Sequence, residues 1–387
     1  MPASDALQAT PRVSVIMATY NGARFIRAAI DSIVAQTHTD FDLIVVDDAS
    51  TDATAEILAG ITDPRLRVIR NVTNMGVARS RNIAFAAARG DYVALLDHDD
   101  LSLPARLACQ VDYLDAHPHT VLVGTRSQVL EQGALTARAD VSDGSPALMA
   151  WLLQLANPLV CSSVMMRGAA ARSLAVFMRA EMEFADDYDL YHRLAAYGSI
   201  ARIDVPLTIY RLHEGNAFRH NEKKMSANAA RVLAPSLEKL LGGDASAAAK
   251  LIVHHVAAGA PLPGPVALDL LCRAIDRITR HHISLADGAP ATQRAIERHA
   301  HVVWRKVLRR TARKGCITRA RLLAARPVGF KPSVRDLASI VAGDLVVRVM
   351  LTTIKAGLGG LRTVRRALSP QPATGASGGA VTSRVSS

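Results

Sequence analysis

Lysine is absent from the first 220 residues of this 387-residue chain, so arginine alone supplies the basic side chains there. Residues 1–220 contain 19 arginines and 25 acidic residues, a net charge of −6, whereas residues 221–387 contain 27 basic and 9 acidic residues, a net charge of +18. The missing lysine argues against the glycine-rich, lysine-containing phosphate loop that nucleotidyltransferases commonly carry early in the chain. The break in charge predicts two modules with different roles.

Cysteine is also scarce, with four residues and no CxxC pair, which argues against a disulfide framework or a zinc site and favours a reducing compartment. Residues 1–12 lack the apolar run of a secretory signal. The most apolar stretch, residues 337–361, is interrupted by Asp344, Arg348 and Lys355. This predicts a core helix or a helix lying on a membrane rather than one that spans it.

The basic second half has few aromatic residues to stack on bases, and no helix-turn-helix or RNA-recognition signature is evident. We therefore expect no nucleic-acid partner. An anionic membrane surface facing residues 221–368 is one interpretation of the positive charge. A solvated helical surface without a partner is the alternative.

Two short apolar runs that end on carboxylates are the most informative feature of the chain. They are residues 43–48 (LIVVDD) and residues 92–100 (YVALLDHDD). Such runs are typical of parallel strands buried on both faces, and the acids would follow at the carboxyl edge of the sheet, where open α/β folds bind ligands. Because clustered carboxylates repel one another, we expect a compensating cation, Mg²⁺ or Mn²⁺, that also binds a diphosphate.

Strand and helix patterns alternate along the first half, which predicts right-handed βαβ units and an α/β fold with a mainly parallel sheet flanked by helices. Ala-, Leu- and Arg-rich helices follow. The expected strands are residues 13–18, 43–48, 66–69, 92–97, 121–124 and 162–166, and the expected helices include 25–34, 78–88, 105–116 and 186–196. The expected domains are a leader (1–10), an α/β domain (11–220), a basic α-helical region (221–368) and a disordered tail (369–387).

Six motifs in succession resemble the signatures of family 2 glycosyltransferases. The resemblance covers about residues 11–220 and implies the GT-A (Rossmann-like) fold and inverting sugar transfer from a nucleotide diphosphate. The motifs are residues 13–21 (VSVIMATYN), 45–52 (VVDDASTD), 76–82 (GVARSRN), 96–100 (LDHDD), 186–190 (DDYDL) and 210–213 (YRLH).

The resemblance assigns the first donor-binding residues to the turn after the first strand, Thr19, Tyr20 and Asn21. Tyr20 would stack on the nucleobase; the alternative is a tyrosine that only packs the turn. Asp48 would accept a hydrogen bond from a base N–H, which favours uracil, or else cap the next turn. Arg81 would hold phosphate or base, with an ion pair to Asp97 or Asp99 as the alternative.

The run Asp97-His98-Asp99 matches the DxD motif of the family. The resemblance implies that Asp99 binds the metal ion and that Asp97 reaches the ribose or the metal. His98 would line the donor site or point away from it. His213, which follows an apparent edge strand, would help to bind metal or pyrophosphate, or serve a structural role.

An inverting transferase also needs a base for the acceptor hydroxyl. The resemblance assigns this role to Asp187 with support from Asp186, where the family usually has Glu-Asp. The alternative is that both acids only stabilise a helix N-terminus. We expect a UDP-sugar donor and a glycan or lipid-linked acceptor in surface polysaccharide synthesis. The expected location is cytoplasmic, either free or peripheral on the inner face of the cell membrane. The alternatives are a nucleotide-sugar hydrolase or nucleotidyltransferase, and a non-catalytic nucleotide-binding scaffold.

Overall fold

The computed structural model describes residues 10–137, 143–216, 221–315 and 317–325. Packing groups residues 1–330 into one unit and residues 331–387 into a second, of which no residue is described. The apolar stretch at 337–361 and the expected tail therefore lie outside the described residues. The domain boundaries expected from the sequence stay predictions.

Nine strands of the described chain form one sheet, in the order β3-β2-β1-β4-β8-β6-β9-β5 with β7 paired to β6. The strands are β1 Val13–Thr19, β2 Phe41–Asp47, β3 Leu66–Arg70, β4 Tyr92–Leu95, β5 Leu101–Ser102, β6 Thr120–Glu131, β7 Ala134–Ala137, β8 Met165–Arg167 and β9 Ser199–Leu212. The ladders β1–β2, β2–β3, β1–β4 and β6–β9 are parallel, whereas β8 runs antiparallel to both β4 and β6. The predicted α/β fold is confirmed.

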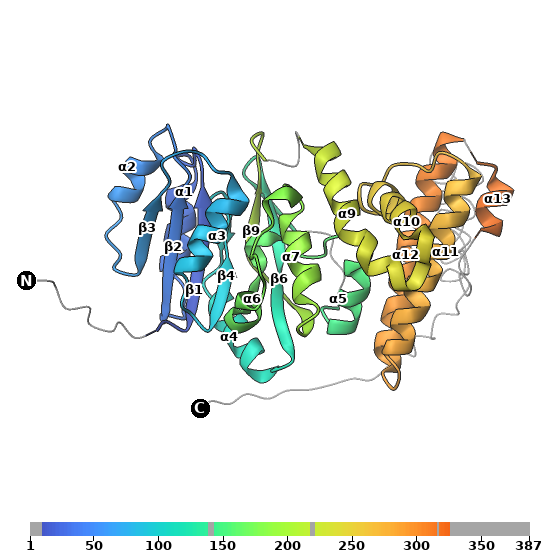
Figure 1. Cartoon of the computed structure of the whole chain (residues 1–387), viewed down its shortest axis with the longest axis horizontal. Coiled ribbons are helices and arrows are strands. Elements are labelled where there is room, and N and C mark those ends of the chain that lie inside the picture. Colours follow the sequence, from blue (N-terminus) through green and yellow to red (C-terminus); the bar gives the residue numbers. More distant parts are fainter. Residues whose placement is uncertain (1–9, 138–142, 217–220, 316, 326–387) are drawn as a thin grey trace, which may run out of the picture. The chain divides into compact units, whose positions relative to one another are not determined.

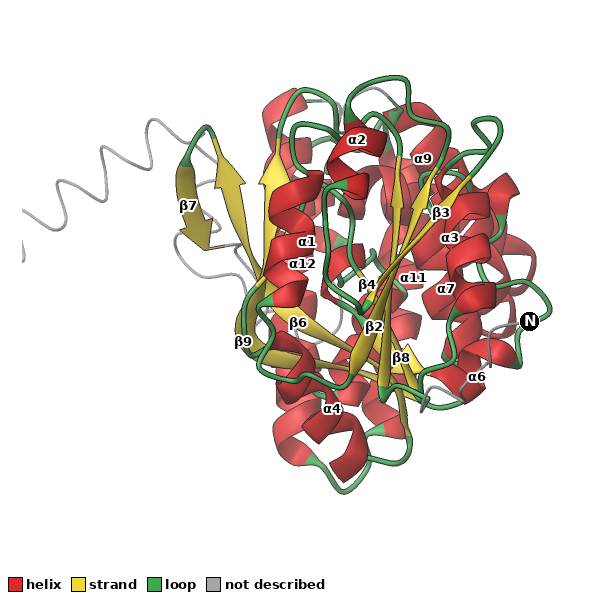
Figure 2. Cartoon of the chain, turned by 90° about the vertical axis from the view of Figure 1, so that its left-hand side faces the viewer, coloured by secondary structure: helices red, strands yellow, loops and turns green. Residues whose placement is uncertain are grey.

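Helices cover both faces of this sheet (Figure 2). The first-half helices are α1 Ile26–Val34, α2 Thr54–Ala59, α3 Val77–Ala87, α4 Arg106–Ala116, α5 Pro146–Leu153, α6 Gly168–Arg172 and α7 Asp186–Leu194. Met17 of β1 packs in one core with Ile30 of α1 and Leu107 of α4, and α3 contacts the opposite face of β1 and β2. Coverage on both sides explains why β1 and β4 are buried along their whole length.

The predicted helical region after residue 221 is confirmed as far as it is described (Figure 1). It comprises α9 Glu222–Leu241, α10 Ala245–Leu251, a π-helical turn Ile252–Ala257, α11 Pro265–Leu285, α12 Pro290–Lys314 and α13 Arg319–Ala324. Helix α9 packs on α7, and α11 and α12 pack on α5, where Trp151 Nε1 donates to Thr279 Oγ1 at 3.2 Å. Among the described helices, none combines the length and the apolar character that a membrane crossing requires.

Two strand predictions need correction. The strand before His213 is not an edge strand, because β9 lies between β6 and β5. Residues 161–163 form a 3-10 turn before the short β8, so the strand expected at 162–166 begins only at Met165. The turn puts Ser162 against the backbone N–H of Asp97, which donates to Ser162 Oγ at 3.0 Å.

Candidate active site

A cavity of about 350 Å³ lies at the carboxyl ends of β1 and β4 and reaches to the start of α7. Nine of the eleven residues expected at the site line it: Thr19, Tyr20, Asp48, Arg81, Asp97, His98, Asp99, Asp186 and Asp187. His213 contacts the cavity through Asp99, and Asn21 faces a neighbouring loop. The fold therefore gathers residues that span almost 170 positions of sequence.

Arg81 of α3 bridges the two acidic parts of the cavity. Its Nη2 donates to Asp97 Oδ1 at 2.5 Å, and its Nη1 donates to Asp186 Oδ2 at 2.9 Å. The side chain of Arg81 is only 9% exposed, so the ion pairs operate where water screens them little. Burial opposes the charge, but the surrounding groups, with the carboxylates of Asp97 and Asp186 among them, together outweigh it and hold the pKa of Arg81 above its ordinary value. The ion-pair alternative for Arg81 thus applies to Asp97 and also to Asp186.

The three carboxylates that follow β4 form a candidate metal site. Asp97, Asp99 and Asp100 each present an oxygen atom, and these atoms lie within 4.8 Å of one another. Asp100 is fully buried, and its Oδ2 accepts no hydrogen bond from the part of the chain that the structure describes. Burial, with the charges of Asp99 and Asp97, raises the pKa of Asp100 well above its ordinary value. An oxygen-rich donor set with an unsatisfied buried oxygen fits Mg²⁺ or Mn²⁺.

The end of β9 closes this acidic cluster from the other side. His213 Nε2 lies 2.8 Å from Asp99 Oδ2, and Asn216 Nδ2 donates to the same oxygen at 3.4 Å. Arg211 donates through its backbone N–H to Asp100 Oδ1 at 2.9 Å. The last residues of β9 and the following turn therefore orient two of the three carboxylates.

Asp186 and Asp187 begin helix α7, and both face the cavity. Asp187 Oδ2 accepts a hydrogen bond from Asn157 Nδ2 at 2.8 Å. Burial and the neighbouring charge of Asp186 raise the pKa of Asp187 to about 7, although Arg81 acts in the opposite direction. Burial also raises the pKa of Asp186, although the charge of Arg81 acts to lower it. A carboxylate with a pKa near neutrality is suited to take and release a proton.

Asp48, one residue past the end of β2, holds the loop that leads into α3. Its Oδ1 accepts from Asn71 Nδ2 at 2.7 Å and from the N–H of Met75 at 2.8 Å, and its Oδ2 accepts from the N–H of Gly76 at 2.8 Å. Burial opposes its charge, but these donors prevail and lower the pKa of Asp48. Asp48 is therefore ionised, and it lines the cavity.

The first turn presents Tyr20 to the cavity and is fixed by its neighbours. Tyr20 is 45% exposed, which leaves its ring available to a ligand. Asn21 has a left-handed backbone (φ 49°), and its Oδ1 accepts from the N–H of Thr51 at 2.9 Å. Asn21 thus ties the turn to the segment after β2. A Cβ atom on Gly22 would lie 2.4 Å from Thr19 Oγ1 and 2.8 Å from His98 Cδ2, so only glycine lets these side chains approach.

His98 lines the cavity because β4 ends at Leu95, before strand alternation would fix the direction of that side chain. The sequence interpretation assigned no role to four further residues at the site: Asp100, Phe184, Asn216 and Met225. The position of Asp100 in the LDHDD motif was a usable signal. The others lie in turns or on α9 and carry no local pattern that points to the cavity.

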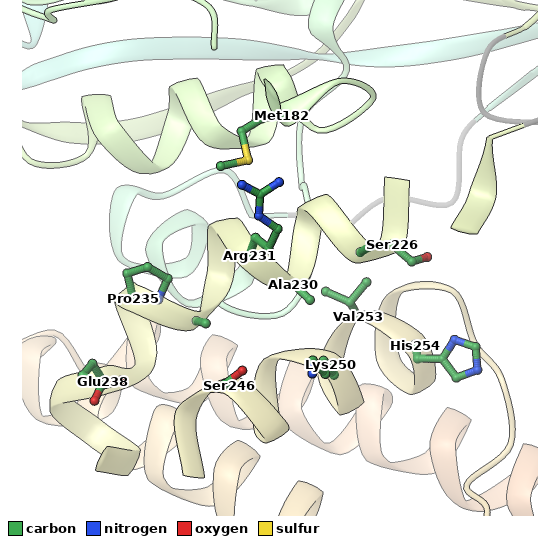
Figure 3. A pocket seen from close by; sticks show the side chains of 12 residues that line it. Met182, Ser226, Ala230, Arg231, Pro235, Glu238, Ser246, Lys250, Val253 and His254 are labelled. Carbon is green, nitrogen blue, oxygen red and sulfur yellow. The ribbon is translucent and has the colours of Figure 1, made fainter. Parts of the chain in front are cut away.

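A larger cavity of about 1090 Å³ lies between α9, α10 and the π-helical turn (Figure 3). Half of its lining side chains are apolar, three of them alanines, and the other half includes Arg231, Glu238, Lys250 and His254. It contains no cluster of acids and no residue expected at the site. Its size exceeds that of the cavity at β1 and β4, but the chemically competent groups lie in the smaller one.

Comparison with known proteins agrees with this geometry. Residues 14–172 match the sequence model of the family described as "Glycosyl transferase family 2". The chain is 38% identical over 193 residues to the Bacillus subtilis protein named "Putative glycosyltransferase EpsE"; the match spans 49% of this chain and 68% of that protein. It is 28% identical over 219 residues to WfaP of Escherichia coli, named "UDP-Glc:alpha-D-GlcNAc-diphosphoundecaprenol beta-1,3-glucosyltransferase", spanning 55% of this chain and 82% of that one.

The fold also resembles a solved structure. The crystal structure of residues 1–349 of S. aureus TarS in complex with UDP-GlcNAc matches 81% of this chain and 87% of that one, with a TM-score of 0.51 and 18% identity. This likeness extends past the region that the sequence matches cover. It supports the predicted GT-A architecture, a sheet flanked by helices and followed by a helical region.

Proposed function

The chain belongs to glycosyltransferase family 2 and is a glycosyltransferase, and from that premise we propose an inverting transfer of a sugar from UDP to a glycan or lipid-linked acceptor. One observation carries the proposal: Asp187, the three carboxylates after β4 and Arg81 meet in a single cavity. The name of WfaP, a glucosyltransferase that uses UDP-glucose and a diphosphoundecaprenol-linked acceptor, supports the donor and acceptor classes.

In the proposed reaction Asp187 takes the proton of the acceptor hydroxyl while the hydroxyl oxygen attacks the anomeric carbon. The new glycosidic bond forms on the face opposite UDP, the bond to the diphosphate breaks, and UDP leaves. Asp186 and Arg81 hold the base in place through the 2.9 Å ion pair. Asp97 and Asp99, with His213 beside them, would hold Mg²⁺ or Mn²⁺, and the bound ion would neutralise charge on the departing diphosphate.

The other predicted donor contacts belong to the same proposal. The exposed ring of Tyr20 stacks on the base, and ionised Asp48 accepts a hydrogen bond from the uracil N–H. The net charge of +18 in residues 221–387 supports a peripheral position at the inner face of a membrane, where lipid-linked acceptors lie. Failure of the intact protein to sediment with anionic vesicles at low salt would rule out that location.

Donor binding tests the proposal. We expect UDP-sugars to raise the melting temperature only with Mn²⁺, and GDP- and dTDP-sugars to raise it less. Asp99→Ala should abolish the Mn²⁺-dependent shift, whereas Asp112→Ala, an exposed acid on α4, should retain it. Release of UDP and free sugar that no acceptor stimulates would favour a hydrolase instead. Binding without any turnover would favour the non-catalytic scaffold.

A further inference from the structure

Phe184, two residues before Asp186, has a left-handed backbone conformation with φ at +67°. Bulky aromatic residues rarely adopt this conformation, because the Cβ atom crowds the backbone. Glycine would adopt it without strain. Strained residues persist where their surroundings fix them, and they concentrate at functional sites.

Helix α9 fixes this turn. Asn228 Nδ2 donates to the backbone oxygen of Glu183 at 3.0 Å, and the Lys224 ammonium pairs with the Glu183 carboxylate. Lys224 Nζ also lies 5.6 Å from the centre of the Phe184 ring. Arg231 Nη1 donates to Asn228 Oδ1 at 3.0 Å, which orients the amide. Figure 3 shows Arg231 extending from α9 toward Met182, just ahead of the same turn.

The strained residue lines the active-site cavity together with Met225 of α9. Both side chains are apolar, in a cavity whose other walls carry five carboxylates: Asp48, Asp97, Asp99, Asp186 and Asp187. Tyr20 and Asp48 mark the part of the cavity proposed for the nucleobase. The acceptor hydroxyl has to reach Asp187, so the acceptor approaches the start of α7, where Phe184 lies.

We propose that Phe184 and Met225 form the apolar wall of the acceptor subsite and pack against the apolar face of the acceptor sugar ring. This inference rests on the proposed function and specifies where its acceptor binds. An aromatic residue in a backbone conformation suited to glycine lowers the stability of the folded protein. In return, its ring is placed in the cavity, where it can contact a ligand. Ligand sites are typically lined by apolar side chains, and a small number of polar groups fix the orientation of the ligand.

The test exploits the strain. Phe184→Gly removes the ring and relieves the backbone, and Gln132→Gly relieves a second left-handed residue (φ 49°) in the β6–β7 turn, outside the cavity. We expect both variants to melt no earlier than the native protein and to keep its affinity for UDP with Mn²⁺. Phe184→Gly should raise the acceptor KM at least about tenfold, with a smaller change in kcat. Gln132→Gly should leave both constants unchanged, and Phe184→Tyr should restore most of the acceptor affinity.

The assay uses UDP-glucose as donor, with N-acetylglucosaminyl-diphosphoundecaprenol and methyl glycosides as acceptor probes. An unchanged acceptor KM in Phe184→Gly overturns the inference, as does a loss confined to kcat, which would indicate a role in positioning Asp187. If Phe184→Gly melts earlier than the native protein and Gln132→Gly does not, the ring of Phe184 serves the stability of the fold, and the inference is overturned. A native protein that transfers sugar to none of the probes overturns the proposed function, and the inference with it.

Discussion

His213 Nε2 lies 2.8 Å from Asp99 Oδ2, although 114 residues separate the two in sequence. The ring of His213 also packs against Phe25, with 4.7 Å between the ring centres. These contacts fix the imidazole between the first helix and the acidic cluster. At the proposed metal site His213 would therefore either join Asp99 in binding the cation or orient the Asp99 carboxylate.

We expect His213→Ala to weaken Mn²⁺ binding in the presence of UDP by about 10–100-fold, since residues that orient metal ligands typically contribute that much. Its melting temperature should fall little, because the side chain remains partly exposed. His119→Ala, at an exposed position before β6, is the matched control. Titration of Mn²⁺ by calorimetry measures the difference. Equal affinities in the two variants would assign His213 a structural role.

The transfer rate should depend on pH through Asp187. Burial and Asp186 raise the pKa of Asp187 to about 7, and only the ionised carboxylate acts as a base. The rate should therefore fall about tenfold per pH unit below neutrality and level off above it. Asp187→Asn should lower kcat by about 10²- to 10⁴-fold and remove this acid limb, while UDP binding with Mn²⁺ persists. An acid limb that survives in Asp187→Asn would assign the base to another group.

Removal of Arg81 should destabilise the protein in a pH-dependent way. Arg81→Ala leaves Asp97 and Asp186 without their buried partner, which typically costs about 3–5 kcal/mol. Without Arg81 nothing opposes the effect of burial, and the pKa of Asp186, already raised in the native protein, rises further above its unfolded value. The loss should therefore be smallest at acidic pH, where the carboxyl of Asp186 is protonated, and should grow as the pH rises. Urea denaturation at two pH values measures it, with exposed Arg79→Ala as the control. A loss of unfolding free energy in Arg81→Ala that does not change with pH would contradict the ion-pair account.

Gly22→Ala should disturb the first turn of the donor site. The added Cβ would meet Thr19 Oγ1 at 2.4 Å and His98 Cδ2 at 2.8 Å, so one of these side chains has to move. We expect the affinity for UDP with Mn²⁺ to fall by about tenfold, or about 1.4 kcal/mol. Gly60→Ala, whose Cβ would meet its nearest atom at 3.6 Å, should leave that affinity unchanged. If Gly22→Ala binds UDP as tightly as the native protein does, the turn adjusts to the added Cβ without consequence for the donor.

The first half of the site follows from patterns in the sequence. The apolar runs before Asp48 and Asp97 predict strands buried on both faces, and parallel pairing of β1 with β2 and β4 brings their ends to one edge. The pairing of Arg81 with Asp186 across 105 residues has no such local cause. Only the resemblance to a family pointed to Asp186 and Asp187, and it assigned no partner to them.

Other features were hidden by local irregularity. Pro206 interrupts the long strand β9, and the register with β6 shifts beside it, between Thr125 and Arg126 and again before Ser127. Proline suggests an edge strand, whereas here a bulge accommodates it inside the sheet. The left-handed turn at Phe184 lacked the glycine or asparagine that usually marks one. Contacts from a helix some forty residues later stabilise it.

The place of α9 in the chain bears on when the enzyme becomes active during its synthesis. A nascent chain released only as far as residue 220 already contains each acid of the cavity, from Asp48 to Asp187. It still lacks Lys224 and Asn228, which fix the turn before α7. It also lacks Met225, part of the cavity wall. The acids of the cavity are therefore all present on the ribosome before α9 emerges, whereas the contacts that hold the turn at Phe184 form only after α9 has followed.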